Sequence, residues 1–399
     1  MKILFITQFL PYYPDTGGKI KSWEILKILC RKNKVWLVCF VDKKENNVYE
    51  NEVKKICWEV KTFFQPIITK AYQSLKYKAF LSLFSLKPFR VYKHHSSEFI
   101  KYLQEIVKKN DFDIIYIDHD VMYQYLDYIQ KKGKLLIFDQ HNISSQASWR
   151  NFLIEKNLIG KAAYFLETIK WHFYEKKYLK YFDHIFTISE IDKNKLISSG
   201  VKKEKIEFLP IPLKIKKLFK FNSKTKNILF VGLMSWKPNE DGFWWFYKKV
   251  YPLIKESIKD ITLTVIGAYP SKKIINESKK DKSLKVLGYV KDIDNFYKKA
   301  SVFVVPIRSG GGIRIKILKG LSYGLPIVST TIGAEGLKLL NNSEILLADD
   351  PGDFAHKVID FMTDPFLAET ISRNGIKFIE RNYSYPNAKN VLAVLNEHE

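Results

Sequence analysis

The sequence has few cysteines and no long hydrophobic run. Its 399 residues include three cysteines, Cys30, Cys39 and Cys57, without the paired spacing of a zinc site or a disulfide framework. A reducing compartment is therefore expected. No apolar run reaches the ~18 residues that a membrane-spanning helix needs, and Pro and Gly follow the opening MKILFIT too early for a signal peptide. The sequence predicts a cytoplasmic protein, either soluble or peripheral on the inner face of the cell membrane.

Arginine and acidic residues are also scarce. Lys and Arg number 66 against 42 Asp and Glu, which gives a formal net charge of +24, yet only seven of these cations are Arg. Proteins that read nucleic acid commonly use Arg forks on guanine and phosphate, and no helix-turn-helix, zinc-finger or RNA-recognition pattern is present. We therefore expect no nucleic-acid partner. An anionic membrane surface or a phosphorylated ligand fits the charge better.

What the sequence does contain is a large supply of apolar residues in an alternating pattern. The 46% hydrophobic content excludes disorder, and short apolar runs alternate with helical stretches, which predicts an α/β fold with parallel sheets. Strands are predicted at residues 3–7, 35–41, 114–117, 135–139 and 185–189 in the first half, and at 228–231, 263–266, 285–287, 302–305 and 327–330 in the second. The sequence predicts four segments: an N-terminal domain (1–211), a lysine-rich linker (212–226), a C-terminal domain (227–380) and a tail (381–399) that could pack back on the first domain.

Polar residues follow the predicted strands of the first half, where doubly wound sheets bind ligands. Gly17 and Gly18 lie just before a helix predicted over residues 22–29, where backbone N–H groups could meet a phosphate or a sugar. The motif is not GxGxxG, so a plain glycine turn is the alternative. The next strand ends carry Asp118-His119-Asp120, then Asp139-Gln140-His141-Asn142, then Glu190. These residues predict a cluster of polar side chains at the carboxyl edge of the sheet, although either histidine could instead be structural.

The most informative segment is VFVVPIRSGGGIRIKILKGLSYGLPIVST, residues 302–330. Three glycines, Gly310 to Gly312, separate a strand from a helix that is predicted to start near Ile313. That start would place Arg314 and Lys316 in the first helical turn, where the helix dipole disfavours a cation by roughly 0.3 to 1 kcal/mol. An anion at the helix start, above all a diphosphate, would explain the placement. Side chains that point to solvent are the alternative.

At these residues the sequence resembles the retaining GT-B glycosyltransferases, the glycosyl transferases group 1 family that includes sucrose synthases and bacterial mannosyltransferases. The resemblance runs nearly end to end through FDQHN, FDHIFTISEID and ILFVGLMSWKPNEDGFWWF, and is most specific from VLGYVKDIDNF to TTIGAEGL. It implies two Rossmann-like doubly wound lobes facing across a cleft. A nucleotide-diphosphate sugar would bind the second lobe and a glycan or lipid-linked acceptor the first, for retaining transfer in cell-surface polysaccharide or glycolipid assembly.

The resemblance also implies roles for individual residues. The expected catalytic residues are His119, Arg314 and Lys316. The expected donor-binding residues are Gly18, Gly232, Lys237, Asn239, Tyr289, Val290, Gly310, Gly311, Gly312, Lys319 and Glu335. The expected acceptor-side residues are Gly17, His141, Asn142 and Glu190. No metal and no cofactor is expected, because the family needs no metal; the pattern Asp118-His-Asp120 would suit a divalent metal, but it recurs at 111–113 and 292–294 and is therefore weak.

Two departures from the family pattern matter. Leu233 stands where many relatives have Arg, and Gly311 and Lys319 stand where the family often has two Glu separated by seven residues. An ammonium group cannot accept a hydrogen bond from the nucleotide ribose. Either Lys319 donates to the nucleotide instead, or the protein is a catalytically silent subunit that supports a partner enzyme. A nucleotide-sugar epimerase is the third alternative.

A membrane contact is predicted for Pro66 to His95, which has six Lys or Arg, no acid, and repeated Tyr, Phe and Leu. Such a segment could rest on anionic lipid. A buried helix edged with lysines is the alternative.

Overall fold

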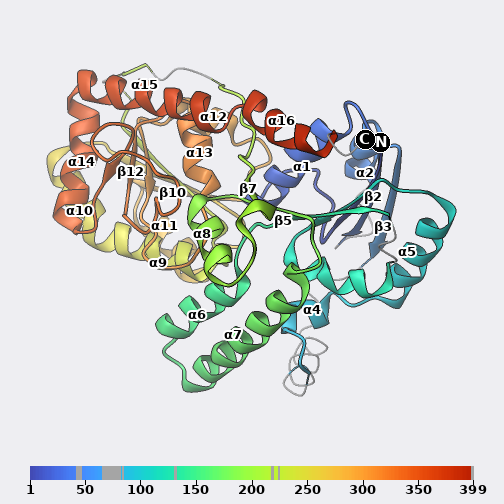
Figure 1. The fold of residues 1–399 in the computed structure, drawn as a ribbon. Helices are drawn as coiled ribbons and strands as arrows, with labels where there is room; N and C mark the ends of the chain where they lie inside the picture. The colour runs from blue at the N-terminus through green and yellow to red at the C-terminus, as the bar shows by residue number, and fades with distance from the viewer. Residues whose placement is uncertain are drawn as a thin grey trace. The chain divides into compact units, whose positions relative to one another are not determined.

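The computed structural model describes residues 1–41, 47–64, 82, 85–129, 133–216, 220–222 and 225–396. The chain forms two compact units, Met1–Ile211 with Ala388–Glu399, and Pro212–Asn387. Each unit is an α/β structure built on its own parallel sheet (Figure 1). The predicted fold class is confirmed.

The first unit is built on a sheet in the order β3-β2-β1-β4-β5-β6-β7, with every pair parallel. This is the order of a doubly wound sheet, so the carboxyl ends of β1, β4 and β5 lie side by side at one edge. The strands are β1 (Lys2–Thr7), β2 (Lys34–Val41), β3 (Glu59–Phe64), β4 (Ile114–Asp118), β5 (Leu135–Asp139), β6 (His184–Thr187) and β7 (Ile206–Phe208).

Helices cover the first sheet, and two of them form a hairpin that extends away from it (Figure 1). The hairpin consists of α6 (Ser144–Ile154) and α7 (Leu158–Leu179). The other helical segments are α1 (Gly17–Leu29), α2 (Asn47–Lys54), α4 (Phe89–Lys93), α5 (Ser97–Lys109), η1 (Asp120–Tyr128), α8 (Glu190–Ser198) and η2 (Lys203–Lys205). The core between sheet and helices is rich in aromatic rings, including Phe40, Phe99 and Tyr125.

The second unit repeats this plan with the sheet order β10-β9-β8-β11-β12-β13, again parallel throughout. The strands are β8 (Asn227–Val231), β9 (Thr262–Ile266), β10 (Leu284–Gly288), β11 (Val302–Val305), β12 (Ile327–Ser329) and β13 (Leu346–Leu347). Because β8 and β11 are neighbours, the loops that follow them meet at one edge of the sheet.

The helical segments of the second unit and of the chain end are α9 (Lys237–Trp245), η3 (Phe246–Val250), α10 (Tyr251–Ser257), α11 (Lys272–Lys280), α12 (Asp294–Lys299), α13 (Ile315–Ser322), α14 (Pro351–Thr363), α15 (Pro365–Asn382), α16 (Tyr385–Ala393) and η4 (Val394–Asn396). Among the described residues, none of these helices, and none in the first unit, has the length and apolar character to cross a bilayer.

All ten predicted strands are confirmed, and three further strands were not predicted. The additional strands are β3, β7 and β13. The last two have only three and two residues, and β3 is a partly exposed edge strand, so none of them forms a distinct apolar run.

Two predicted helix starts are wrong. The first helix begins at Gly17 rather than near Ser22, so Gly17 and Gly18 form its first turn. The helix after the triple glycine begins at Ile315 rather than Ile313, and Arg314 is its N-cap residue. The predicted lipid-binding segment 66–95 lies largely outside the described residues; its described end contains α4, where the Phe89 N–H donates to Glu167.

Candidate functional site

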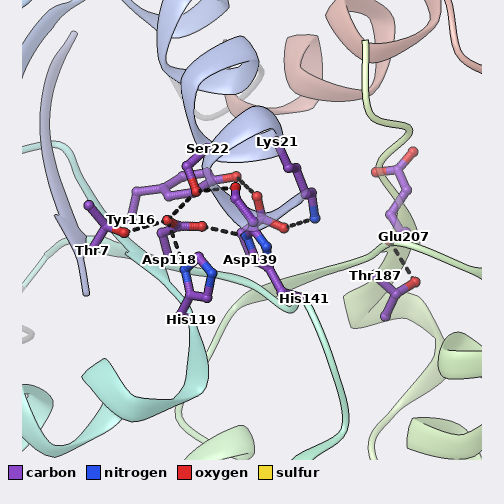
Figure 2. A network of polar contacts seen from close by, with 11 residues as sticks. Thr7, Lys21, Ser22, Tyr116, Asp118, His119, Asp139, His141, Thr187 and Glu207 are labelled. Atoms are coloured by element: carbon purple, nitrogen blue, oxygen red, sulfur yellow. Dashed lines mark hydrogen bonds and ion pairs between the residues drawn. The ribbon is translucent and has the colours of Figure 1, made fainter. Parts of the chain in front are cut away.

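Asp118 is the centre of a buried polar network in the first unit (Figure 2). It ends the central strand β4 and is fully buried. Its Oδ2 accepts hydrogen bonds from Thr7 Oγ1 at 2.6 Å and Ser22 Oγ at 2.7 Å, and lies 3.0 Å from His119 Nδ1. Its Oδ1 lies 2.7 Å from His141 Nε2. The carboxylate therefore joins β1, α1, β4 and the loop after β5.

The charge of this carboxylate is set by the two histidines. Burial raises the pKa of Asp118, but attraction to His119 and His141, reinforced by their hydrogen bonds, outweighs burial and holds this pKa well below its ordinary range. Burial, and then the neighbouring His119, lowers the pKa of His141 against the opposing effect of Asp118. The network therefore contains a permanent anion that orients two imidazole rings.

The two rings stack on each other and lie against the first turn of α1. Their centroids are 3.7 Å apart, and the backbone at His119 has a positive φ of 78°. A Cβ atom on Gly18 would lie 3.1 Å from His119 Nε2 and 3.7 Å from His141 Nδ1. Glycine at position 18 therefore leaves Nε2 of His119 beside the N–H groups of a helix start, a place suited to a phosphate or a sugar hydroxyl.

A second buried carboxylate, Asp139, ends the neighbouring strand β5. It pairs with Lys21 Nζ and accepts a hydrogen bond from Tyr116 Oη at 2.9 Å. Lys21 is fully buried on α1. Sequence reasoning missed Lys21, Ser22 and Thr7, because only the paired register of β1, β4 and β5 brings them to the two aspartates.

Three of these residues also have the identities of metal ligands. Ligand atoms of Asp118, His119 and His141 all lie within 4.8 Å of one another, and among the described residues this group could hold a divalent cation such as zinc. Asp120 does not join them, since its carboxylate accepts from Ser144 Oγ instead. The Asp-x-Asp spacing therefore does not form a shared site. Both oxygens of Asp118 already accept hydrogen bonds, so the group is organised as a hydrogen-bonded hub.

Two expected acceptor-side residues lie outside this network. Asn142 is exposed just after His141, and Glu190 is the half-buried first residue of α8, after the N-cap Ser189. The described contacts join neither of them to Asp118 or Asp139.

The triple glycine of the second unit forms a loop closed by Arg314. Gly310 and Gly312 have positive φ angles of 97° and 75°, which glycine adopts without strain. Arg314 is only 4% exposed, and its Nη1 donates to the carbonyl oxygens of Gly311 and Gly312, both at 2.5 Å. Its guanidinium carbon lies 5.4 Å from the ring centroid of Trp236. A solvent-facing Arg314 is therefore excluded, and its placement in the first helical turn was wrong.

Lys316 connects this loop region to the loop after β8. Its Nζ donates to Val231 O at 2.6 Å and to Asn239 Oδ1 at 2.8 Å. Burial, and then repulsion by Arg314, lowers the pKa of Lys316 to about 7. Asn239 in turn donates to Leu233 O. A Cβ atom on Gly232 would lie only 2.7 Å from the side chain of Asn239. A solvent-facing Lys316 is also excluded.

The structure therefore brings together Gly232, Asn239, Gly310 to Gly312, Arg314 and Lys316 at the carboxyl ends of β8 and β11. Lys237 is the exposed first residue of α9. Tyr289, which is 54% exposed, and Val290 follow β10 at the same edge of the sheet, and Glu335 is half-buried in the turn after β12. A compact cationic and glycine-rich centre thus lies at this edge of the second sheet. Gly18, which was also expected to bind the donor, lies on α1 of the first unit.

Lys319 faces a different partner. Its Nζ lies 3.7 Å from Asp294 Oδ1 on α12, and Lys216 Nζ lies 3.3 Å from the other oxygen of the same carboxylate. Burial lowers the pKa of Lys319 while Asp294 opposes the shift. The two ammonium groups of α13 at positions 316 and 319 therefore have separate partners, and Lys319 is held by an ion pair within the protein.

Comparisons with known proteins agree with this architecture. Residues 225–364 match the family described as Glycosyl transferases group 1. An uncharacterised 44.6 kDa protein from the cps region of Klebsiella pneumoniae is 24% identical over 396 residues, 96% of either chain. The capsular polysaccharide biosynthesis glycosyltransferase CapM of Staphylococcus aureus is 26% identical over 221 residues, 50% of this chain and 57% of CapM.

A structural neighbour covers the whole molecule. A TarM variant from S. aureus, solved with fondaparinux, α-GlcNAc-glycerol and UDP, superposes with a TM-score of 0.70 at 12% identity over 99% of both chains. The chain therefore has the GT-B fold, and its second unit contains a glycosyl transferases group 1 domain.

Proposed function

We propose that this protein transfers a sugar from a nucleotide-diphosphate donor, with retention at the anomeric carbon, to a glycan or lipid-linked acceptor during assembly of a cell-surface polysaccharide. The observation that carries the proposal is the centre formed by Arg314, Lys316 and the loop Gly310 to Gly312, within the residues that match the glycosyl transferases group 1 family. Three similarities support this reading: UDP is bound in the TarM structure, one relative comes from a cps region, and CapM is a capsular polysaccharide biosynthesis glycosyltransferase.

The donor diphosphate would bind at the glycine loop. Glycines at 310 to 312 let a ligand approach the backbone closely, and the start of α13 favours an anion. Arg314 and Lys316 supply the positive charge that a departing diphosphate needs. In the structure their donors contact carbonyl oxygens and Asn239, so a diphosphate would exchange some of these contacts for stronger charged ones.

The network around Asp118 would serve the reacting sugar or the acceptor. Asp118 holds His119 through Nδ1, which leaves Nε2 beside Gly18 as the atom available to a substrate hydroxyl. A protein-held imidazole in fixed orientation reduces the entropy cost of positioning a substrate. Gly17, His141, Asn142 and Glu190 are the proposed acceptor-side residues.

The test is turnover with a panel of nucleotide-diphosphate sugars in the presence of EDTA. We expect slow release of nucleoside diphosphate from one donor without acceptor, and a product of retained anomeric configuration, identified by NMR, when a capsule-type acceptor is added. An inverted product would refute retention, and dependence on added metal would refute metal-independent transfer.

One observation favours a second candidate, the catalytically silent subunit. Lys319 occupies the position where the family often has Glu, and it is committed to Asp294. The nucleotide ribose would then lack that acceptor. The two candidates are separated by the variant Lys319→Ala: an active enzyme whose Lys319 contacts the donor would lose roughly 1 to 2 kcal/mol of nucleotide affinity. A silent subunit would bind no nucleotide with either residue.

A further inference from the structure

The hairpin of α6 and α7 has an apolar face that is exposed among the residues that the structure describes. At its tip Leu158 and Ile159 are each 82% exposed, and Leu153 at the end of α6 is 58% exposed. Along α7, Phe165, Leu166, Ile169 and Phe173 are also exposed. Contiguous exposed apolar surface of this extent marks a site of interaction.

The pattern along α7 shows that this face is a single stripe. Residues 158, 162, 165, 166, 169 and 173 recur at helical spacing and therefore lie on one side of the helix. The opposite side carries Trp171, Tyr174 and Tyr178, which are buried against the core. The outward side of a surface helix is normally polar, so the packing of α7 against the described residues of its own unit does not explain this apolar stripe.

Two lysines continue the same stripe at the end of α7. Lys176 and Lys180 extend the helical spacing beyond Phe173, and they border a groove of about 1110 Å³ between α6, α7 and α8 that Trp149, Ile169 and Phe173 help to line. Lys202 lies at the same groove. Residues 144–180 contain seven Lys or Arg against three Glu.

The three acids of the hairpin are already engaged. Glu175 accepts hydrogen bonds from Ser144 N and from Ser145 Oγ, and Glu167 accepts from Phe89 N. Glu155 accepts from two backbone N–H groups of the hairpin turn. Seven cations outnumber these three carboxylates, so the net charge of the hairpin is positive.

We infer that the α6–α7 hairpin is a docking surface for an anionic lipid bilayer. The stripe would lie along the membrane interface, with Leu158, Ile159 and Phe173 among the acyl chains. Lys176 and Lys180 would contact lipid phosphates. An apolar stripe together with lysines is the combination that binds such interfaces, whereas a second protein copy would not need the cations. The inference rests on the proposed function only in suggesting that the acceptor is membrane-bound.

The test is co-sedimentation of the full chain with vesicles of phosphatidylcholine alone and of equal parts phosphatidylcholine and phosphatidylglycerol. We expect binding to the anionic vesicles that falls with salt. The double variant Leu158→Ser with Ile159→Ser should bind about tenfold more weakly, since two nearly fully exposed apolar side chains are removed. Lys176→Glu with Lys180→Glu should remove the preference for phosphatidylglycerol.

The matched control is Phe366→Ser, which changes an 81% exposed apolar residue at the start of α15 in the second unit and should leave vesicle binding unchanged. As a direct readout, an environment-sensitive dye on Ile159→Cys should shift to the blue with anionic vesicles, and the same dye on Phe366→Cys should not.

Equal recovery with both vesicle types, or unchanged binding of the tip variant, would overturn the inference. So would a dimer that the tip variant converts to monomer, because the stripe would then be covered by a second copy. Nucleoside-diphosphate binding, measured by calorimetry without lipid, should be the same in the tip variant and the wild type. Loss of lipid binding can thus be told apart from failure of the proposed function.

Discussion

At the scale of single residues, the ammonium group of Lys316 is the most informative titratable group of the second unit. Its pKa of about 7 lies far below the ordinary value of 10.5, because the group is buried and close to Arg314. Between these two values the unfolded chain binds more protons than the folded chain, so this lysine makes stability rise with pH across that range. A bound diphosphate would reverse the effect by favouring the charged form.

The first prediction follows from this titration. At about pH 8, binding of a nucleoside diphosphate should be accompanied by uptake of close to one proton, because a largely neutral Lys316 becomes charged. Calorimetric titrations in buffers of different ionisation enthalpy measure this uptake. In Lys316→Met the uptake should disappear. An equal uptake in that variant would assign the proton to another group.

The second prediction concerns Asp118 in the first unit. Asp118→Asn removes the anion that two histidines and two hydroxyls share, and should lower the free energy of unfolding by about 3 kcal/mol, the scale for breaking a buried ion pair. Urea denaturation measures the change. Asp113→Asn is the matched control: this exposed carboxylate accepts only from Lys2 N among the described contacts, and should change stability by less than about 1 kcal/mol. Similar stabilities for both variants would contradict the role of Asp118 as a hub.

Residue-scale prediction from sequence succeeded where a residue directly follows a strand. Asp118, His119 and His141 were expected at neighbouring strand ends, and the structure brings them together. Lys21 could not be found in this way, because helical spacing does not reveal which lysine of α1 faces a buried aspartate. The partner of Lys319 was also missed, since Asp294 lies on a different helix.

At the scale of elements, the turns after β8 and β9 pack so closely that a side chain cannot be added. A Cβ on Gly267 would lie 1.7 Å from the carbonyl oxygen of Gly232, which is backbone and cannot rotate away. The Gly267 N–H also donates to Gly288 O at the end of the neighbouring strand β10. This contact fixes the turn after β8, which leads into α9 and to Asn239, the partner of Lys316.

The third prediction tests this contact. Gly267→Ala should lower the free energy of unfolding by about 3 kcal/mol, the upper range for overpacking, and should weaken nucleotide binding as well. Gly160→Ala, in helix α7, is the control. The new Cβ atom would meet only the flexible side chain of Glu155, so this substitution should be neutral or slightly stabilising. Thermal unfolding of both variants measures the difference, and a Gly267→Ala protein as stable as the wild type would show that the loops can separate.

Element boundaries were the weakest part of the sequence reasoning. Two glycines disfavoured a helix start at Gly17, yet α1 begins there because Lys21 and Ser22 on its first turns are fixed by Asp139 and Asp118. The helix after the triple glycine begins late, since Arg314 turns back to the loop carbonyls instead of entering α13. In both cases tertiary hydrogen bonds overrode local preference.

At the scale of the whole molecule, the chain consists of two α/β units, each built on an all-parallel sheet. The alternation of apolar runs with helical stretches predicted this class. The glycosyl transferases group 1 match lies within the second unit, where glycines and cations lie together at adjacent strand ends. The sequence did not predict which nucleotide or sugar would bind. Tyr289, the proposed contact to the nucleobase, follows β10 in a loop, where no periodic pattern fixes the position of a side chain.

The central claim is that the second unit binds a nucleoside diphosphate at the loop Gly310 to Gly312, and calorimetric titration with UDP, GDP, ADP and dTDP in EDTA tests it most directly. We predict saturable binding of at least one of them to the wild type. Arg314→Ala should bind it roughly 1.5 to 3 kcal/mol more weakly. Arg308→Ala, which removes an exposed Arg paired with Asp241 just before the loop, should bind as the wild type does. No binding of any nucleotide, or equal affinity in the Arg314 variant, would contradict the claim.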